Sequence, residues 1–154
     1  MDCFERSRIA GHITGSAWVV NSSYTHVLMT HHAKLEKWLQ LGGHADGDSN
    51  IKNVATKELK EESGLTKIEL LSSSIFDLDI HTIPERKVEK EHEHFDIRYR
   101  CVAEMSEPLH LNHESKELAW IPLGKLDELT KGNRSIIRMS EKTSHIKGKV
   151  PLLW

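Results

Sequence analysis

The chain has 154 residues, of which 38% are hydrophobic and 29% are charged. This balance is typical of one globular domain, so we expect a single domain over residues 1–154 with its core at about 12–142 and peripheral segments at 1–10 and 144–154. The net charge of -2 excludes a general basic field for nucleic acid, and no apolar run reaches the ~20 residues of a membrane span. A polar N-terminus and two cysteines without a CxxC pair favour the cytoplasm.

Hydrophobic periodicity and turn residues divide the chain into alternating strands and helices. The expected elements are strands at 12–20, 26–30 and 37–41, a helix at about 50–63, one long or interrupted strand at 68–80, strands at 94–103 and 116–122, and helices at 123–130 and 133–142. The charged segment 81–93 contains Pro84 and is expected to be a mobile loop. This order predicts an α+β fold, a mixed α/β/α sandwich, with the first helix on one face of a mixed sheet and the C-terminal helices on the other.

Three glutamates occupy unusual positions on the helix expected at 50–63. At ~100° per residue, Glu58 and Glu62 fall on the apolar face that includes Ile51 and Leu59, and Glu61 lies at its margin. Carboxylates are rarely buried without a partner charge, and neighbouring carboxylates raise one another's pKa. A hard divalent cation such as Mg²⁺ removes both difficulties because it prefers oxygen ligands. The helix is therefore predicted to carry a carboxylate metal site.

The stretch from Gly43 to Leu65 resembles the signature of the Nudix hydrolases, G-x5-E-x7-R-E-U-x-E-E-x-G-U, in which U is an apolar residue. Its spacing is the family's, without insertion or deletion. The residues that fit are Gly43, Glu58, Leu59, Glu61, Glu62, Gly64 and Leu65. Two positions depart from the signature, since Ser49 stands in place of the first glutamate and Lys57 in place of the arginine. An ammonium does not replace a bidentate guanidinium, so we expect altered contacts between the loop and the helix.

The resemblance implies the Nudix fold and the activity of a Nudix-type pyrophosphohydrolase, an acid anhydride hydrolase. It also implies Mg²⁺ or Mn²⁺ as the cofactor, bound by Glu58, Glu61 and Glu62 with the backbone carbonyl of Gly42. These three glutamates are the predicted catalytic residues, and either Glu58 or Glu62 would act as the general base.

Relatives often use a further acid from a later loop. Glu114 is the preferred candidate for that metal ligand and Glu117 is the alternative, while solvent-facing acids without a role would look the same in the sequence.

Other polar residues are candidates for substrate binding. His44 follows the glycine pair, and His94, Asp96 and Arg98 alternate so that they share one side of their strand. The GGH loop and the HxHxD strand together resemble a bacterial Nudix subgroup. Imidazoles bind phosphates or transition metals, so these four residues are predicted to contact the substrate, with Arg86 of the charged loop reaching over an anion. Local hydrogen bonding of each histidine is the alternative.

The leading functional hypothesis is a divalent-metal-dependent hydrolase of a nucleoside diphosphate linked to another moiety, or of a related pyrophosphate. Its partner would be a small-molecule phosphate anhydride, with no nucleic acid or membrane involved, and the family also allows a homodimer. A non-catalytic Nudix domain that senses a nucleotide or sugar phosphate is the alternative, which Ser49 and Lys57 favour. A prenyl-diphosphate isomerase is less favoured because no cysteine stands next to the metal motif.

Overall fold

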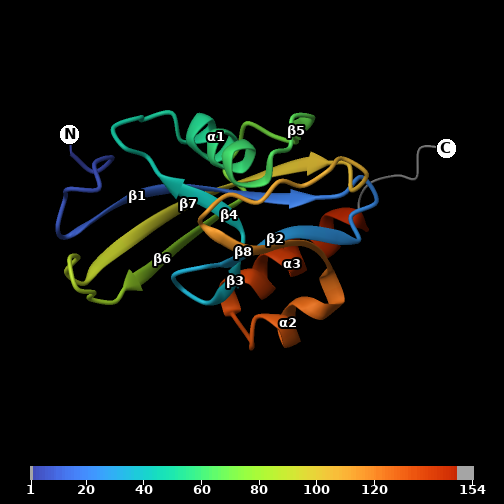
Figure 1. Cartoon of the computed structure of the whole chain (residues 1–154). Coiled ribbons are helices and arrows are strands. Elements are labelled where there is room, and N and C mark those ends of the chain that lie inside the picture. The colour runs from blue at the N-terminus through green and yellow to red at the C-terminus, as the bar shows by residue number, and fades with distance from the viewer. Residues whose placement is uncertain (1, 149–154) are drawn as a thin grey trace.

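The computed structural model describes residues 2–148 and shows a mixed sheet between helices (Figure 1). The elements are β1 (Gly11–Val20), β2 (His26–His32), β3 (Lys37–Leu39), β4 (Leu41–His44), α1 (Ile51–Ser63), β5 (Ile68–Leu70), β6 (Asp77–Ile83), β7 (His92–Ala103), β8 (Ser115–Pro122), the 3-10 turn η1 (Leu123–Lys125), α2 (Leu126–Leu129) and α3 (Arg134–Lys147). Within the described residues, no helix is long and apolar enough to cross a membrane. The predicted α/β/α sandwich is confirmed.

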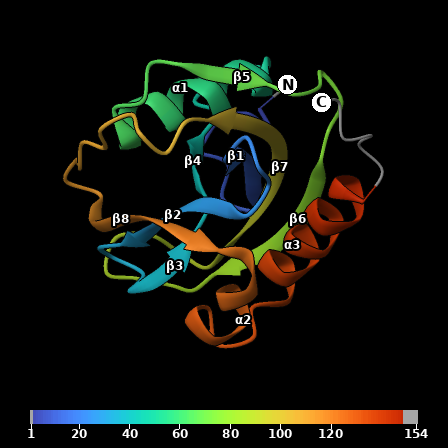
Figure 2. The same cartoon turned by 90° about the vertical axis from the view of Figure 1, so that its right-hand side faces the viewer.

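Strand β1 lies at the centre of the sheet. It pairs in parallel with β7 along its whole length, from Gly11 opposite Glu93 to Val20 opposite Val102. Its other edge pairs antiparallel with β4. Strands β5 and β6 follow one another along the outer edge of β7, which matches the predicted interrupted strand. A second antiparallel group, β3–β2–β8, joins β1 where Val27 lies opposite Val20. The sheet is strongly curved (Figure 2).

Alternation along β1 divides the core between the two faces of the sheet. Ala17 and Val19 pack on the side of α1, in contact with a cluster that includes Leu59. Trp18 packs on the opposite side with residues of α2 and α3, and its indole N–H donates to the hydroxyl of Thr143 at 2.9 Å. Both faces of the sheet are therefore covered, as predicted from the order of the strands and helices.

Two expected boundaries around the sheet are wrong. The segment 81–93 is not a loop throughout, because β6 and β7 continue to pair as far as Ile83 opposite His92. Only residues 84–91 connect them. The glycine pair is not a loop either, since it pairs with β1 and forms the strand β4.

The C-terminal helix is also longer than predicted. α3 extends to Lys147 instead of residue 142, since the turn that contains Thr143 is buried against the sheet. The helix expected at 123–130 is the short pair η1 and α2. Of the expected tail at 144–154, residues 149–154 lie outside the described residues.

Candidate metal and substrate site

Helix α1 holds the predicted catalytic glutamates at fixed depths. The side chain of Asn50 caps its first turn by accepting from the Asn53 N–H at 3.3 Å, and Gly64 ends it with a φ of 73°. The buried face of the helix lies on β1 and β4. This packing directs Glu58 and Glu62 toward the glycine pair of β4.

Glu62 is almost completely buried, with 3% of its surface exposed. Its Oε1 accepts one hydrogen bond, from the Gly42 N–H at 3.0 Å. Burial, together with the negative charges of Glu58 and Glu114, raises the pKa of Glu62 to about 8, although the hydrogen bond from Gly42 lowers it. Glu62 therefore lies in a place that disfavours a free carboxylate.

Glu58 is partly buried against the second glycine. A Cβ added to Gly43 would overlap the Glu58 carboxylate, so only glycine leaves room for this contact. Burial raises the pKa of Glu58, and the neighbouring charge of Glu61 adds to the effect. The glycine pair thus serves both glutamates: the first glycine donates a hydrogen bond, and the second leaves space.

The other two predicted metal ligands are more exposed. Glu61 faces solvent and its Oε1 lies 3.7 Å from the Nζ of Lys57. Glu114 lies in the loop before β8, where its backbone carbonyl accepts from the Ala33 N–H at 2.8 Å. Its charge contributes to the raised pKa values of Glu58 and Glu62, so Glu114 lies near these two glutamates.

The donor set fits a hard divalent cation. Glu58 and Glu62 are withdrawn from water near the charge of Glu114, and their raised pKa values indicate that the groups around them among residues 2–148 compensate their negative charge only in part. Oxygen ligands with uncompensated charge are what Mg²⁺ and Mn²⁺ require.

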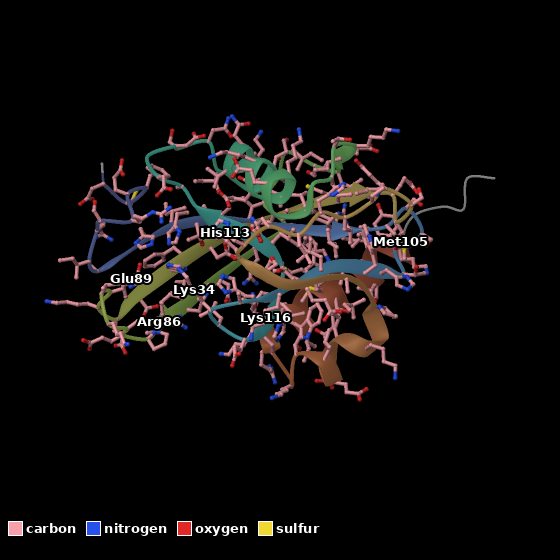
Figure 3. All side chains as sticks on the ribbon, in the orientation of Figure 1. Lys34, Arg86, Glu89, Met105, His113 and Lys116 are labelled. Carbon is pink, nitrogen blue, oxygen red and sulfur yellow. The ribbon has the colours of Figure 1, made fainter. Side chains whose placement is uncertain are left out.

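Arg86 lies where the β6–β7 loop approaches the β2–β3 turn. One of its terminal nitrogens lies 3.5 Å from the carbonyl oxygen of Lys34, and Figure 3 shows both side chains on the same side of the molecule as His113. Burial lowers the pKa of His32, and the charges of Lys34 and Arg86 lower it as well. The charge of Glu114 raises the pKa of the same ring. Lys34 and Arg86, the basic rim, therefore lie close to the acidic loop residue.

His44 and His94 are two members of a histidine cluster formed by four strands. Its members are His12 on β1, His44 on β4, His81 on β6, and His92 and His94 on β7. Burial lowers the pKa of His44 to about 4, and burial together with the neighbouring imidazoles lowers the pKa of His94 to about 3. Both rings are neutral at pH 7 and offer no positive charge to a phosphate.

Asp96 and Arg98 do not lie in an open site. Asp96 is 2% exposed and accepts from the hydroxyls of Thr14 and Ser16 at 2.9 and 2.7 Å. The Nε of Arg98 donates to the same carboxylate at 2.7 Å, and Arg98 is itself 3% exposed. The structure therefore contradicts the prediction that they contact substrate: their strand turns them toward the interior, where they neutralise each other.

A model of the NUDIX domain family matches residues 12–140. The chain belongs to the Nudix family. No curated protein is similar enough to match it.

Solved structures of Nudix enzymes share the fold of this Nudix chain. A hydrolase of the NUDIX family from Clostridium perfringens is 26% identical with a TM-score of 0.65, and the match covers 88% of this chain and 97% of that one. A Nudix hydrolase from M. smegmatis, RenU, is 16% identical with a TM-score of 0.64, covering 94% and 91%. An Ap4A hydrolase from C. elegans is 15% identical with a TM-score of 0.62, covering 89% and 99%. The predicted family, fold and enzyme class, a Nudix-type pyrophosphohydrolase that acts on small phosphate compounds, are confirmed.

The two departures from the Nudix signature leave the loop before α1 with different contacts. Among residues 2–148, no hydrogen bond joins Ser49 to Lys57. The loop is instead held by the N-terminal segment, where Arg6 donates from its Nε to Asp46 at 2.6 Å and a second bond joins the same two side chains. The Gly47 N–H also donates to the carbonyl of Phe4 at 2.9 Å. The first ten residues, expected to be peripheral, therefore brace the loop of the Nudix motif.

Sequence reasoning missed the buried charges around Asp77. This carboxylate, 4% exposed, accepts from Arg98 of β7 and from Arg138 and Lys142 of α3. The i, i+4 spacing of the two basic residues on α3 was a usable signal, since it places them on one helical face. His12 was missed as well, because nothing local in the sequence shows which strand lies beside β7.

Proposed function

We propose that this Nudix enzyme uses Mg²⁺ or Mn²⁺ to hydrolyse a nucleoside diphosphate linked to another moiety, or a related pyrophosphate. The observation that carries the proposal is the pair of withdrawn carboxylates, Glu58 and Glu62, against the Gly42–Gly43 backbone, with their raised pKa values. Similar folds whose names include an Ap4A hydrolase and a dihydroneopterin triphosphate pyrophosphohydrolase from E. coli support this substrate class.

Glu58, Glu61 and Glu62 would hold the metal with the Gly42 carbonyl, and Glu114 would approach it from the opposite loop. When bound, such an ion neutralises charge on the phosphoryl oxygens and lowers the pKa of a coordinated water. The chain's own contribution is to fix the carboxylates on adjacent turns of one helix and to shield Glu62 from water.

Glu58 is the better candidate for the general base. Glu62 already accepts from the Gly42 N–H, and Glu61 is paired with Lys57, whereas Glu58 makes no hydrogen bond among the described residues. A base must be free to accept the proton of the attacking water, so in this role Glu58 would leave the metal to Glu61 and Glu62. A pKa raised toward the working pH favours that transfer.

The basic rim would bind the part of the substrate beyond the hydrolysed bond. Lys34 and Arg86 lie on two different connections, so an anion between them would draw the β6–β7 loop toward the β2–β3 turn. A guanidinium is suited to bidentate phosphate contacts. These two residues are therefore proposed to set the affinity for substrate, not the rate of the chemical step.

The test is phosphate release from a panel of nucleoside triphosphates, nucleotide sugars, dinucleoside polyphosphates and NAD-type compounds with Mg²⁺ or Mn²⁺. Turnover of at least one compound is expected, and Glu58→Gln should reduce kcat by about 100-fold or more. Glu69→Gln, at an exposed acid on β5, is the matched control and should retain full activity. Tight binding of one compound without turnover of any would instead support a sensor domain.

A further inference from the structure

The histidine cluster brings imidazoles together from strands that are distant in the sequence. The parallel register places His12 opposite His94, and the antiparallel register places His81 opposite the same residue. The ring centroid of His12 lies 4.8 Å from the ring centroid of His94, and 5.0 Å from those of His92 and His44. Four neighbouring strands thus point imidazoles at one volume of space.

The ring nitrogens of three members are spaced as metal ligands would be. One nitrogen from each of His12, His92 and His94 lies within 4.8 Å of the other two, and the Nε2 atoms of His92 and His94 are 3.2 Å apart. Tetrahedral zinc has Zn–N bonds of about 2.0–2.1 Å, which corresponds to about 3.3 Å between ligand nitrogens. The His92–His94 pair already has this spacing, and a bound ion would have to draw the His12 nitrogen toward it.

The ring nitrogens of His12 have no hydrogen-bond partner among the described residues. It is 3% exposed, and neither of its ring nitrogens makes a hydrogen bond of acceptable length and angle, although the Arg8 carbonyl lies near enough to favour its protonated form. A buried polar atom without a partner is costly and rare. A bound ion would give one of these nitrogens a partner.

His92 is already oriented for coordination. Its Nδ1 lies 2.8 Å from the carbonyl oxygen of Lys90. A carbonyl only accepts, so Nδ1 carries the proton and the lone pair of the neutral ring is on Nε2, which faces His94. A hydrogen bond from the far nitrogen of a histidine to a backbone carbonyl is the usual support for a metal ligand.

The cluster lies across strand β4 from the glutamates. Along β4, Gly43 faces Glu58, and alternation turns the next residue, His44, to the other side of the strand. Imidazole nitrogens suit Zn²⁺, Ni²⁺, Co²⁺ and Cu²⁺, whereas Mg²⁺ selects oxygen ligands. We propose that His12, His92 and His94, with His44 as a fourth ligand, bind one divalent transition-metal ion of the zinc class, separate from the Nudix cation.

The test uses the tag-free, full-length chain stripped of metals. Equilibrium dialysis against Zn²⁺ with elemental analysis should give one tightly bound ion per chain, and Co²⁺ should give the visible ligand-field absorption of a nitrogen-ligated site. The double variant His92→Gln/His94→Gln should bind about 100-fold more weakly or worse. His26→Gln/His145→Gln removes two histidines outside the cluster and should leave both signals unchanged.

A second pair of variants separates this site from the Nudix cation. Glu58→Gln/Glu62→Gln should lose activity and keep the Co²⁺ spectrum, while the single variant His44→Gln should alter the spectrum with little effect on the fold. Circular dichroism in EDTA checks that each variant is folded. Wild-type binding that survives in His92→Gln/His94→Gln, or that disappears in the glutamate variant, would overturn the proposal.

Discussion

At the scale of single residues, the depth of Glu62 links the metal site to stability. Burial raises its pKa to about 8, whereas the unfolded chain titrates this side chain near 4.5. Between these values the folded state binds more protons than the unfolded state, so the free energy of unfolding falls as the pH rises. The fold therefore opposes the ionised form of Glu62 unless a cation is present.

We predict that Glu62→Gln stabilises the metal-free protein at pH 8 by about 1–3 kcal/mol and has little effect at pH 5. The amide keeps the oxygen that accepts from Gly42 and removes the buried charge. Urea unfolding in EDTA at the two pH values measures the difference. An equal effect at both values would show that the charge of Glu62 is not the cause.

The space beside Gly43 sets the position of Glu58. We predict that Gly43→Ala lowers kcat by about 10- to 100-fold with a small change in melting temperature. The reason is that the new Cβ would overlap the Glu58 carboxylate and move it away from its position. Gly124→Ala is the matched control, since a Cβ at that position has nothing within 4 Å and should leave the rate unchanged. Steady-state kinetics and a thermal melt suffice. An unchanged kcat in Gly43→Ala would exclude the close contact.

At the scale of elements, the N-terminal segment and the loop before α1 act as one unit. The Arg6–Asp46 pair is half exposed, with 58% and 50% of the side chains accessible, so its direct effect on stability is small. Because Asp46 lies in the loop before α1, we expect the pair to have a larger effect on the geometry of the proposed metal site.

We therefore predict that Arg6→Ala costs less than about 1 kcal/mol of unfolding free energy but lowers kcat/KM by roughly 3- to 10-fold. A double-mutant cycle with Asp46→Ala should show that the two effects on kcat/KM are not additive. Lys125→Ala, which removes an exposed pair with Glu128, is the control. Additive effects of the two substitutions would mean that the pair does not brace the loop.

At the scale of the whole molecule, the charges around Asp77 join β6, β7 and α3. Burial alone would raise the pKa of Asp77, but hydrogen bonds from Arg138 and Lys142 outweigh it, so the pKa is lowered. A carboxyl group whose pKa is lowered by folding stabilises the fold when the pH is above its pKa in the unfolded chain. That stability is lost as the pH falls through its pKa in the folded chain. The network thus favours the folded chain at neutral pH.

We predict that Asp77→Ala destabilises the protein by about 3 kcal/mol or more at pH 7, because it removes the buried acceptor that Arg98, Arg138 and Lys142 share. The difference from wild type should shrink in strong acid, where the carboxylate of the wild type is protonated too. Chemical denaturation at several pH values measures this, with the exposed Asp127→Ala as control. A difference that stays constant with pH would contradict the assignment.

The sequence predicted what depends on local spacing. The bounds of α1 followed from apolar periodicity and from Gly64, and the Nudix resemblance implied that Glu58 and Glu62 lie near Gly42, although it did not predict the hydrogen bond from the Gly42 N–H to Glu62. The roles of Asp96 and Arg98 could not be predicted. Alternation placed them on one side of β7, but only the tertiary structure shows that Thr14 of β1 donates to Asp96 and that α3 packs against Arg98.

The same limit applies to the ends of strands and to the N-terminal segment. The charges in 84–91 concealed the continuation of β6 and β7, because pairing between two edges outweighs the low strand propensity of charged residues. The partner of Arg6 lies 40 residues away, and nothing in its own surroundings points to Asp46. Long-range contacts of this kind need a structure.

The parallel pairing of β1 with β7 has a consequence for how the chain folds. The residues that pair, such as Gly11 and Glu93, are separated by more than half of the chain, and both strands lie inside the sheet. Loop closure over such a span is slow, and an unpaired central strand exposes its edges until its partner arrives. During synthesis, β1 emerges before β7 and must wait for it, so the ribosome-bound chain should remain open to chaperones until β7 has also been made.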